Sequence, residues 1–166
     1  MKKALLVMDM QEVTVGDNHA AMFRYPTDLL RRVNAVIEQN RDSLIVYVRN
    51  LMKDNPLNRL APVRVFPGTA EAELASGLCV LSPHVIDKYR GDAFSNPRLP
   101  ELLQREGVWE VELMGVDGGG CVALTAMGAC KAGFAVALNT GAIGTVFPEK
   151  RDRYYEKLKK QGARIL

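Results

Sequence analysis

The chain has few of the residues that build metal centres and disulfides. Its 166 residues include three cysteines and two histidines. Cys79, Cys121 and Cys130 leave one cysteine over from any disulfide, and no pair has the spacing of a zinc site, which is typical of a reducing compartment. Only His19 and His84 add imidazole groups. The sequence therefore predicts neither a disulfide framework nor a histidine-rich metal site.

Long hydrophobic runs are also missing. After Met1, Lys2 and Lys3, only residues 4–8 are apolar before Asp9, which is too short for a signal sequence or a membrane span. The 22 basic residues stand against 19 acidic ones, giving a net charge of +3, and the basic positions are scattered along the chain. We therefore expect a cytoplasmic protein that binds neither a membrane nor a nucleic acid.

Apolar strand patterns alternate with helical patterns along the chain. The expected strands are residues 4–8, 44–48, 84–87, 109–114, 134–138 and 163–166, and the expected helices are 27–40, 100–106, 121–132 and 149–161, with a short turn of helix within 69–75. This alternation predicts one domain over residues 1–166, with a three-layer α/β/α, doubly wound, six-stranded parallel sheet in the order 3-2-1-4-5-6. Residues 49–67 lack periodicity and are expected to form a long loop that lines a site.

Cys121 stands where a strand is expected to turn into a helix. Gly118, Gly119 and Gly120 turn the chain after the strand at 109–114, and an apolar helix follows. The first N–H groups of a helix have no intrahelical partner and carry the positive end of its dipole, so they stabilise a thiolate or an oxyanion. Cys121 is therefore the expected nucleophile.

Two charged residues follow other strands of the predicted sheet. Asp9 ends the first strand and Lys88 follows the third, and the carboxyl ends of parallel strands share one crevice. Together with Cys121 they predict a mechanism in which Asp9 takes the thiol proton, Lys88 holds the charges, and the thiolate attacks a carbonyl carbon. In the expected strand order Asp9 and Cys121 are neighbours, whereas Lys88 must reach across about two strand spacings of roughly 5 Å each.

At these positions the chain resembles the isochorismatase-like cysteine hydrolase superfamily, which includes nicotinamidases and carbamoylsarcosine amidases. The matching segments are Leu6-Val7-Met8-Asp9-Met10-Gln11, Phe66-Pro67-Gly68-Thr69, Ala72-Glu73-Leu74, Lys88 with Asp92-Ala93-Phe94, and Gly115-Val116 through Cys121-Val122 with Thr125 and Ala126. Their order and spacing cover nearly the whole chain. Each segment is modest alone, and their combination is specific.

The resemblance implies roles for particular residues. Asp9, Lys88 and Cys121 would form a catalytic triad that works through a covalent acyl-enzyme. A cis peptide bond would join Val116 to Asp117, and the backbone amides of Asp117 and Cys121 would form the oxyanion hole. The resemblance also implies a small-molecule substrate and a homo-oligomer, a dimer or a tetramer, in which loops of a neighbour close the pocket.

The chain departs from the family pattern in ways that narrow the chemistry. Metal-binding nicotinamidases carry Asp-x-His after the second strand, where this chain has residues 48–52, Val-Arg-Asn-Leu-Met, so neither a metal nor another cofactor is expected. True isochorismatases lack the nucleophilic cysteine, so Cys121 favours cleavage of a small amide, carbamoyl or related acyl compound. Gly118–Gly120 replace a segment that is Thr-Asp in many relatives, which removes side chains from the pocket wall or loosens it. Residues 139–141 replace the usual Asp-Ala and change the supporting residues.

Two other functions are compatible with the sequence. Residues 118–123 fit the dinucleotide pattern G-x-G-x-x-[GA], which would indicate a Rossmann-type cofactor domain. That fingerprint normally follows the first strand, however, and here Asn139 and Thr140 stand where its acidic residue would be. The third alternative is a family member that binds a small molecule or a partner without turnover.

A few further side chains are candidates for contact with a ligand or for the core. Phe94, in the loop after the third strand, is a candidate substrate contact. Arg49, Asn50 and Arg59 are compatible with recognition of a carboxylate or another anion, although a solvated loop is the commoner role. Trp109 is expected in the core, because the fourth strand should be central.

Overall fold

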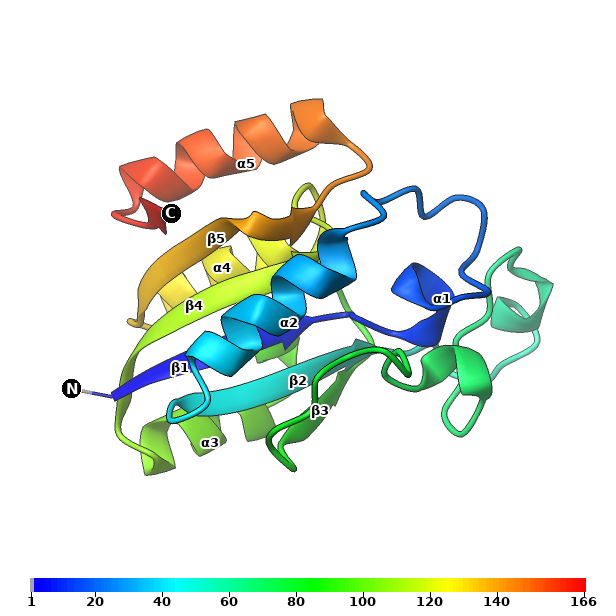
Figure 1. The fold of residues 1–166 in the computed structure, drawn as a ribbon, viewed down its shortest axis with the longest axis horizontal. Coiled ribbons are helices and arrows are strands. Elements are labelled where there is room, and N and C mark those ends of the chain that lie inside the picture. The colour runs from blue at the N-terminus through cyan, green and yellow to red at the C-terminus, as the bar shows by residue number, and fades with distance from the viewer. Residues whose placement is uncertain (1) are drawn as a thin grey trace.

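Six strands form one sheet in the computed structural model, which describes residues 2–166 (Figure 1). They are β1 (Lys2–Met8), β2 (Leu44–Asn50), β3 (Val85–Lys88), β4 (Val108–Val116), β5 (Ala135–Gly144) and β6 (Arg164–Ile165). Their order is β3-β2-β1-β4-β5-β6, and all neighbouring strands run parallel. The expected fold class and strand order are confirmed.

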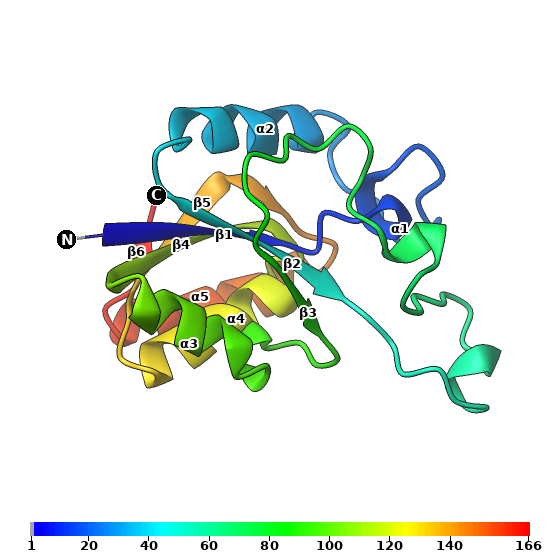
Figure 2. The ribbon, with the colours of Figure 1, turned by 90° about the horizontal axis from the view of Figure 1, so that it is seen from below.

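Helices cover both faces of this sheet. They are α1 (Glu12–Val15), α2 (Leu29–Gln39), α3 (Arg98–Arg105), α4 (Cys121–Lys131) and α5 (Pro148–Lys160), with short helical turns η1 (Asn58–Leu60), η2 (Ala70–Ala72) and η3 (Ala93–Ser95). Figure 2 shows α2 on one side of the strands and α3, α4 and α5 on the other. Within residues 2–166, no helix combines the length and the apolar character needed to cross a membrane.

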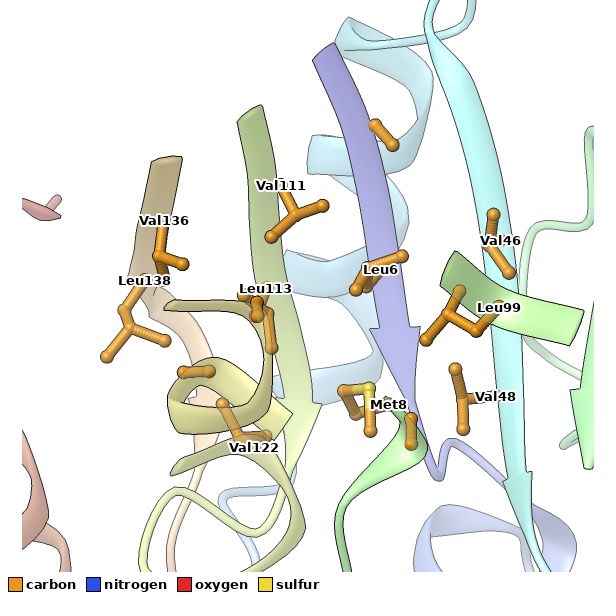
Figure 3. Packing of buried hydrophobic residues seen from close by; sticks show 14 of the residues in the cluster. Leu6, Met8, Val46, Val48, Leu99, Val111, Leu113, Val122, Val136 and Leu138 are labelled. Atoms are coloured by element: carbon orange, nitrogen blue, oxygen red, sulfur yellow. The ribbon is translucent and has the colours of Figure 1, made fainter. Parts of the chain in front are cut away.

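The apolar core lies in two layers, one on each face of the sheet. Leu6 and Met8 of β1 pack toward α3 and α4, where Leu99 and Val122 meet them (Figure 3). Leu5, on the opposite side of the same strand, packs beneath α2. Successive side chains of a strand point to opposite faces, so a sheet covered on both faces needs an unbroken apolar run. Each of these leucines is fully buried, which stabilises the fold by about 1.5–3 kcal/mol per side chain.

Three local features differ from the expectations. β5 continues through Gly144, past the predicted end at residue 138, and α1 adds a helical turn that no periodicity indicated. Trp109 is 42% exposed and does not belong to the core. It is the extra residue where the β1–β4 register shifts, since Lys2 pairs with Val108 and Lys3 with Glu110. A bulged residue stands outside the ladder pattern, which accounts for the exposed indole.

The loops that follow the strands gather at one edge of the sheet. Figure 1 shows α1 and the segment between β2 and β3 beyond the carboxyl ends of β1 and β2. The register places Met8 of β1 beside Val48 of β2 and Gly115 of β4, and it places Asn50 beside Lys88 of β3. The ends of four neighbouring strands therefore open onto one region, the usual position of a ligand crevice in such sheets.

Candidate active site

Asp9, Lys88 and Cys121 meet at this edge of the sheet. Asp9 directly follows β1, Lys88 is the last residue of β3, and Cys121 is the first residue of α4. The Lys88 Nζ atom lies 3.0 Å from Asp9 Oδ2 and 3.1 Å from Cys121 Sγ. The Lys88 side chain is completely buried, and it bridges the intervening strand β2. The long reach demanded by the strand order is thus spanned by the lysine itself.

The backbone holds Asp9 in an uncommon conformation. Its φ of 53° lies in the left-handed region, and its carbonyl oxygen accepts a hydrogen bond of 2.6 Å from the Thr14 hydroxyl. Its N–H donates to Val48 O at 2.9 Å. The carboxylate is only 4% exposed, and its Oδ1 atom finds no hydrogen-bond partner within residues 2–166. One carboxylate oxygen is therefore paired with Lys88, while the other is free to accept a proton.

Asn50 belongs to this cluster, although its role was not predicted. Its Oδ1 atom accepts a hydrogen bond of 3.0 Å from Lys88 Nζ. Gln11 fixes Asn50, because the Gln11 amide accepts from Asn50 N at 2.7 Å and donates to Asn50 O at 3.2 Å and to Ala72 O at 2.9 Å. The sequence predicts that β2 ends at residue 48, which places Asn50 in the following loop. A strand two residues longer would have placed it beside Lys88.

Burial and the neighbouring charges set the protonation states of the cluster. Burial raises the pKa of Asp9, although Lys88 partly opposes this. Burial alone would lower the pKa of Lys88, but the ion pair with Asp9 and the contact with Cys121 outweigh it and the pKa rises. Burial and then the Asp9 carboxylate raise the pKa of Cys121 to about 12, against the opposing effect of Lys88. The resting cluster therefore holds an ammonium at Lys88 and a neutral thiol at Cys121, next to an Asp9 carboxyl group whose affinity for a proton is raised.

This state differs from the thiolate that a helix N-terminus suggests. The N-terminal end of α4 does stand at Cys121, but burial and a carboxylate from another strand dominate the thiol pKa. A thiol with a pKa of about 12 is almost entirely protonated at neutral pH. A nucleophilic role of Cys121 would therefore require a base that takes its proton. The Oδ1 atom of Asp9, which belongs to the same cluster and has no hydrogen-bond partner within residues 2–166, is the candidate for that base.

Replacing the carboxylate should lower the pKa of this thiol. In an Asp9→Asn variant, the Asp9 charge that adds to the effect of burial on the pKa of Cys121 is lost, while the lowering effect of Lys88 stays. We expect the pKa of Cys121 to fall below its wild-type value of about 12, measured from the ultraviolet absorbance of the thiolate during a pH titration. The same titration of a Cys121→Ser variant supplies the signal of the remaining cysteines. An unchanged or higher pKa would contradict this electrostatic account.

The turn before α4 contains two backbone amides without a hydrogen-bond acceptor. The peptide bond between Val116 and Asp117 is cis. Within the turn, Gly120 N and Val122 N both donate to the Asp117 carbonyl oxygen, at 3.0 and 3.1 Å. No atom of residues 2–166 accepts a hydrogen bond from the N–H of Asp117 or of Cys121. Both amides are thus available to a ligand.

The Asp117 side chain ties this turn to two other segments. Its Oδ1 atom accepts from Gly119 N at 2.6 Å, and its Oδ2 atom accepts from Val146 N at 2.6 Å and from the Tyr25 hydroxyl at 3.2 Å. Burial and the Asp117 charge raise the pKa of Tyr25, so its hydroxyl remains a donor. The loop after β5 and the loop before α2 therefore both hold the turn in place. Nothing in the local sequence around residue 117 indicates these long-range partners.

The glycines of the turn pack against the segment between β5 and α5. A Cβ atom on Gly119 would lie 2.7 Å from Phe147 O, and one on Gly118 would collide with the Thr145 hydroxyl. Both glycines are buried. We expected Gly118–Gly120 to leave the pocket wall without side chains. For Gly118 and Gly119 the lack of a side chain instead allows Thr145 and Phe147 to approach the turn closely.

An alanine at Gly119 is expected to destabilise the protein. Crowding in a tightly packed region costs about 1–3 kcal/mol, so Gly119→Ala should lower the free energy of unfolding by that amount. Gly141→Ala is the matched control, because its Cβ atom would lie 3.7 Å from Asn139 Oδ1, an ordinary contact. Urea denaturation followed by circular dichroism compares the two. Equal stability of both variants would show that the turn has room for a side chain.

A cavity of about 430 Å³ opens at Cys121. Its other lining residues are Asn50, Leu51, Met52, Lys53, Asn55, Asn58, Tyr89, Arg90 and Gly91. Phe94 is not among them, and its ring packs 5.8 Å from that of Phe134. Phe94 thus packs against Phe134, and its role as a substrate contact stays a prediction.

The donor set of the cavity does not suit a metal ion. Across residues 2–166, no group of three or more His, Cys, Asp or Glu side chains is arranged to hold one. At the end of β2, the positions after Arg49 are Asn50, Leu51 and Met52, which offer one amide oxygen and a thioether. Neither histidine lines the cavity at Cys121.

The fold is a three-layer α/β/α arrangement, and the cluster of Asp9, Lys88 and Cys121 lies at the carboxyl edge of its sheet. The chain belongs to the Isochorismatase family, whose domain matches residues 3–166. A search of curated proteins gave no match. Similar solved structures include the pyrazinamidase of Pyrococcus horikoshii in complex with zinc, with 28% identity, a TM-score of 0.85, and coverage of 100% of this chain and 99% of that one.

Two further structures are similar over almost their full lengths. PnC1 from L. infantum in complex with nicotinate has 26% identity and a TM-score of 0.86, with coverage of 99% of this chain and 92% of that one. The N-carbamoylsarcosine amidase from Thermoplasma acidophilum has 24% identity and a TM-score of 0.82, with coverage of 99% and 95%, and it shares the fold.

Proposed function

We propose that the protein is a metal-independent cysteine amidohydrolase that cleaves a small amide, carbamoyl or related acyl compound. The observation that carries the proposal is the contact of Lys88 Nζ with both Asp9 Oδ2 and Cys121 Sγ, beside a buried Asp9 oxygen that has no partner within residues 2–166. The similar protein from Pyrococcus horikoshii, which is named a pyrazinamidase and is 28% identical, supports the amide class. A Rossmann-type cofactor function would leave Asp9 and Lys88 without a role.

The chemistry begins with transfer of the thiol proton to Asp9. As the proton moves to Oδ1, Cys121 Sγ attacks the carbonyl carbon of the substrate, and the carbonyl oxygen becomes an oxyanion. The N–H groups of Asp117 and Cys121 bind this oxyanion, and each such donor commonly contributes about 3–4 kcal/mol to the transition state. Lys88 stays protonated and balances the negative charge that moves between Asp9 and the sulfur.

The second half releases the product and restores the thiol. Asp9 gives its proton to the departing nitrogen, and the C–N bond breaks. An amine or ammonia departs, and the acyl group remains on Cys121 as a thioester. A water molecule then attacks the thioester while Asp9 accepts one of its protons. The C–S bond breaks, the acid leaves, and the proton returns to the sulfur. No step needs a group beyond the substrate, water and these residues.

The residues at the end of β2 support the metal-independent form of this chemistry. Asn50 and Met52 stand where the Asp-x-His of metal-binding nicotinamidases is expected, and Asn50 is engaged by Lys88. Amide and thioether groups are weak ligands for zinc compared with imidazole and carboxylate. The carbonyl of the substrate is instead polarised by backbone amides.

Trapping of the acyl-enzyme tests the proposal. The protein is incubated with a panel of small primary amides and carbamoyl compounds, quenched in acid, and analysed by peptide mass spectrometry together with ammonia release. We expect an acyl adduct on the peptide that contains Cys121 and none on the Cys130 peptide. Ammonia release without any Cys121 adduct, undiminished in a Cys121→Ala variant, would refute the mechanism. Absence of both turnover and adduct would favour a family member that only binds its ligand.

A further inference from the structure

The wall of the cavity at Cys121 carries unpaired positive charge. Lys53 and Arg90 both line it, and neither forms an ion pair with any residue in the range 2–166. No Asp or Glu side chain is among the lining residues. Within the described residues 2–166, Lys88 is the one buried lysine or arginine side chain, and it is already paired with Asp9. The open side of the cavity is therefore positive, while the reacting cluster beneath it is close to neutral.

The neighbouring arginines do not share this property. Arg49 makes a bidentate ion pair with Asp87, at 2.7 and 3.0 Å, and a further contact of 2.9 Å with Glu73. Arg59 pairs with Asp54 at 2.6 Å. Arg49 and Arg59, which the sequence offered for anion recognition, are therefore both neutralised by carboxylates. The free charge belongs to Lys53 and Arg90 instead.

Two of the three asparagines that line the cavity, Asn50 and Asn55, keep side-chain NH₂ groups without an acceptor, whereas the Asn58 NH₂ group donates to Lys53 O at 2.7 Å. The Asn50 side-chain oxygen is occupied by Lys88 Nζ at 3.0 Å, and that of Asn55 accepts from Asn58 N at 2.9 Å. No atom within residues 2–166 accepts a hydrogen bond from the side-chain NH₂ groups of Asn50 and Asn55. With their oxygens engaged internally, these two residues offer only donors. Donors and cations together match the requirements of a carboxylate.

We infer that the substrate is an anionic amide, in which a carboxylate lies a few bonds from the scissile carbonyl group. A short dicarboxylic acid monoamide and a carbamoyl amino acid both fit this description. Lys53, Arg90 and the free NH₂ groups of the asparagines hold the carboxylate, and the carbonyl carbon lies over Cys121. The inference rests on the proposed function and adds to it the charge of the substrate, since the proposed function alone admits neutral amides.

Two alkylating reagents test the inference without any turnover. Iodoacetate and iodoacetamide deliver similar groups to sulfur, forming an S–C bond and releasing iodide and the thiol proton, but only iodoacetate is an anion. The ratio of their rates at Cys121, measured by peptide mass spectrometry, reports anion attraction by the cavity. We expect this ratio to fall by about fivefold in Arg90→Gln and again in Lys53→Gln, since each removes one solvent-accessible charge.

A matched control removes one charge elsewhere. Lys131→Gln changes an exposed lysine at the far end of α4, so its ratio at Cys121 should equal that of the wild type. Cys79 and Cys130 are internal references within every sample. Raising the salt concentration should reduce the wild-type ratio toward that of the double variant Lys53→Gln/Arg90→Gln, because salt screens exposed charges.

The outcomes separate the inference from the proposed function. If the ratio at Cys121 is the same in all variants, the anionic-substrate inference is wrong, whatever is hydrolysed. If the ratio responds but neither succinamate nor its neutral diamide releases ammonia, the anion site stands and the hydrolase proposal fails. Turnover of succinamate with a kcat/KM well above that of the diamide, and loss of that preference in Arg90→Gln, supports both. Equal turnover of the two amides upholds the hydrolase and overturns the inference. If Cys121 reacts with neither reagent, both fail.

Discussion

A Cys121→Ala variant should lose amide hydrolysis while keeping its fold. Without Sγ there is no atom to form the acyl-enzyme, and loss of a covalent nucleophile typically reduces turnover by about 10⁴-fold or more. The thiol contacts Lys88 Nζ, which keeps its other partners Asp9 and Asn50 after the change. The charged pair therefore stays satisfied in the variant, and the stability change should be within about 1–2 kcal/mol.

The measurement pairs activity with folding. Ammonia release at saturating and limiting substrate gives kcat and kcat/KM, and thermal unfolding by circular dichroism gives the stability. Cys130→Ala is the matched control, because Cys130 lies near the far end of the same helix α4 and makes no contact with Lys88 or Asp9. Cys121→Ser should be nearly as inactive as the alanine variant, since a hydroxyl is harder still to deprotonate. Activity within tenfold of the wild type in Cys121→Ala would contradict the nucleophile.

The strands of the sheet were predictable because each carries its own signal. Residues 4–8 are an unbroken apolar run, as both faces of β1 are covered. The last six residues of β5 carry no such signal, so the predicted strand ends too early, at residue 138. Residues 139–144, Asn-Thr-Gly-Ala-Ile-Gly, include an exposed threonine and two glycines, and the strand resumes its pairing with β4 only at Ile143 and Gly144, after a register shift. Such tertiary pairing leaves no periodic pattern to detect.

The residues of the site also divide into those that the sequence indicates and those that it does not. Asp9, Lys88 and Cys121 each follow a recognisable strand or turn, so topology alone brings them to one edge. Asn50 and Tyr25 join the site through single side-chain contacts, with Lys88 and Asp117, that no spacing in the sequence reports. These contacts depend on register and loop paths.

The protonation state of Cys121 shows a further limit of local reasoning. A helix N-terminus is visible in the sequence and lowers the pKa of a thiol. Burial and the Asp9 carboxylate raise the pKa to about 12, and both arise from segments far along the chain. The direction of the shift therefore depends on the assembled site and reverses the local expectation.

A Lys88→Met variant should be both inactive and strongly destabilised. Methionine fills similar space, but the substitution leaves the Asp9 carboxylate buried at 4% exposure with no cation beside it. Breaking a buried ion pair in this way typically costs about 3–5 kcal/mol of unfolding free energy. Lys131→Met is the control, because the same change at an exposed position of α4 should cost less than about 0.5 kcal/mol. Urea denaturation at neutral pH measures both.

A double variant separates the lost charge pair from lost packing. Asp9→Asn/Lys88→Met contains neither charge, so it should recover most of the stability that Lys88→Met loses while remaining inactive, because both the base and the cation are gone. If the double variant is as unstable as Lys88→Met, the cost comes from packing and the ion pair is unimportant.

The pH dependence of the stability of Lys88→Met tests independently whether the buried Asp9 carboxylate causes the destabilisation. Burial raises the pKa of Asp9 and Lys88 lowers it, so removing Lys88 should raise that pKa further. A carboxyl group whose folded pKa lies above its unfolded value binds a proton on folding, and it destabilises the folded state at pH values where the unfolded chain is ionised. The stability deficit of Lys88→Met relative to the wild type should therefore be largest at neutral pH and should shrink as the pH falls toward about 4, the ordinary range of an aspartate. Denaturation curves across this range, with Asp9→Asn/Lys88→Met as the reference that lacks the titrating group, measure the difference. A deficit that grows toward acid pH would mean that the buried carboxylate is not its source.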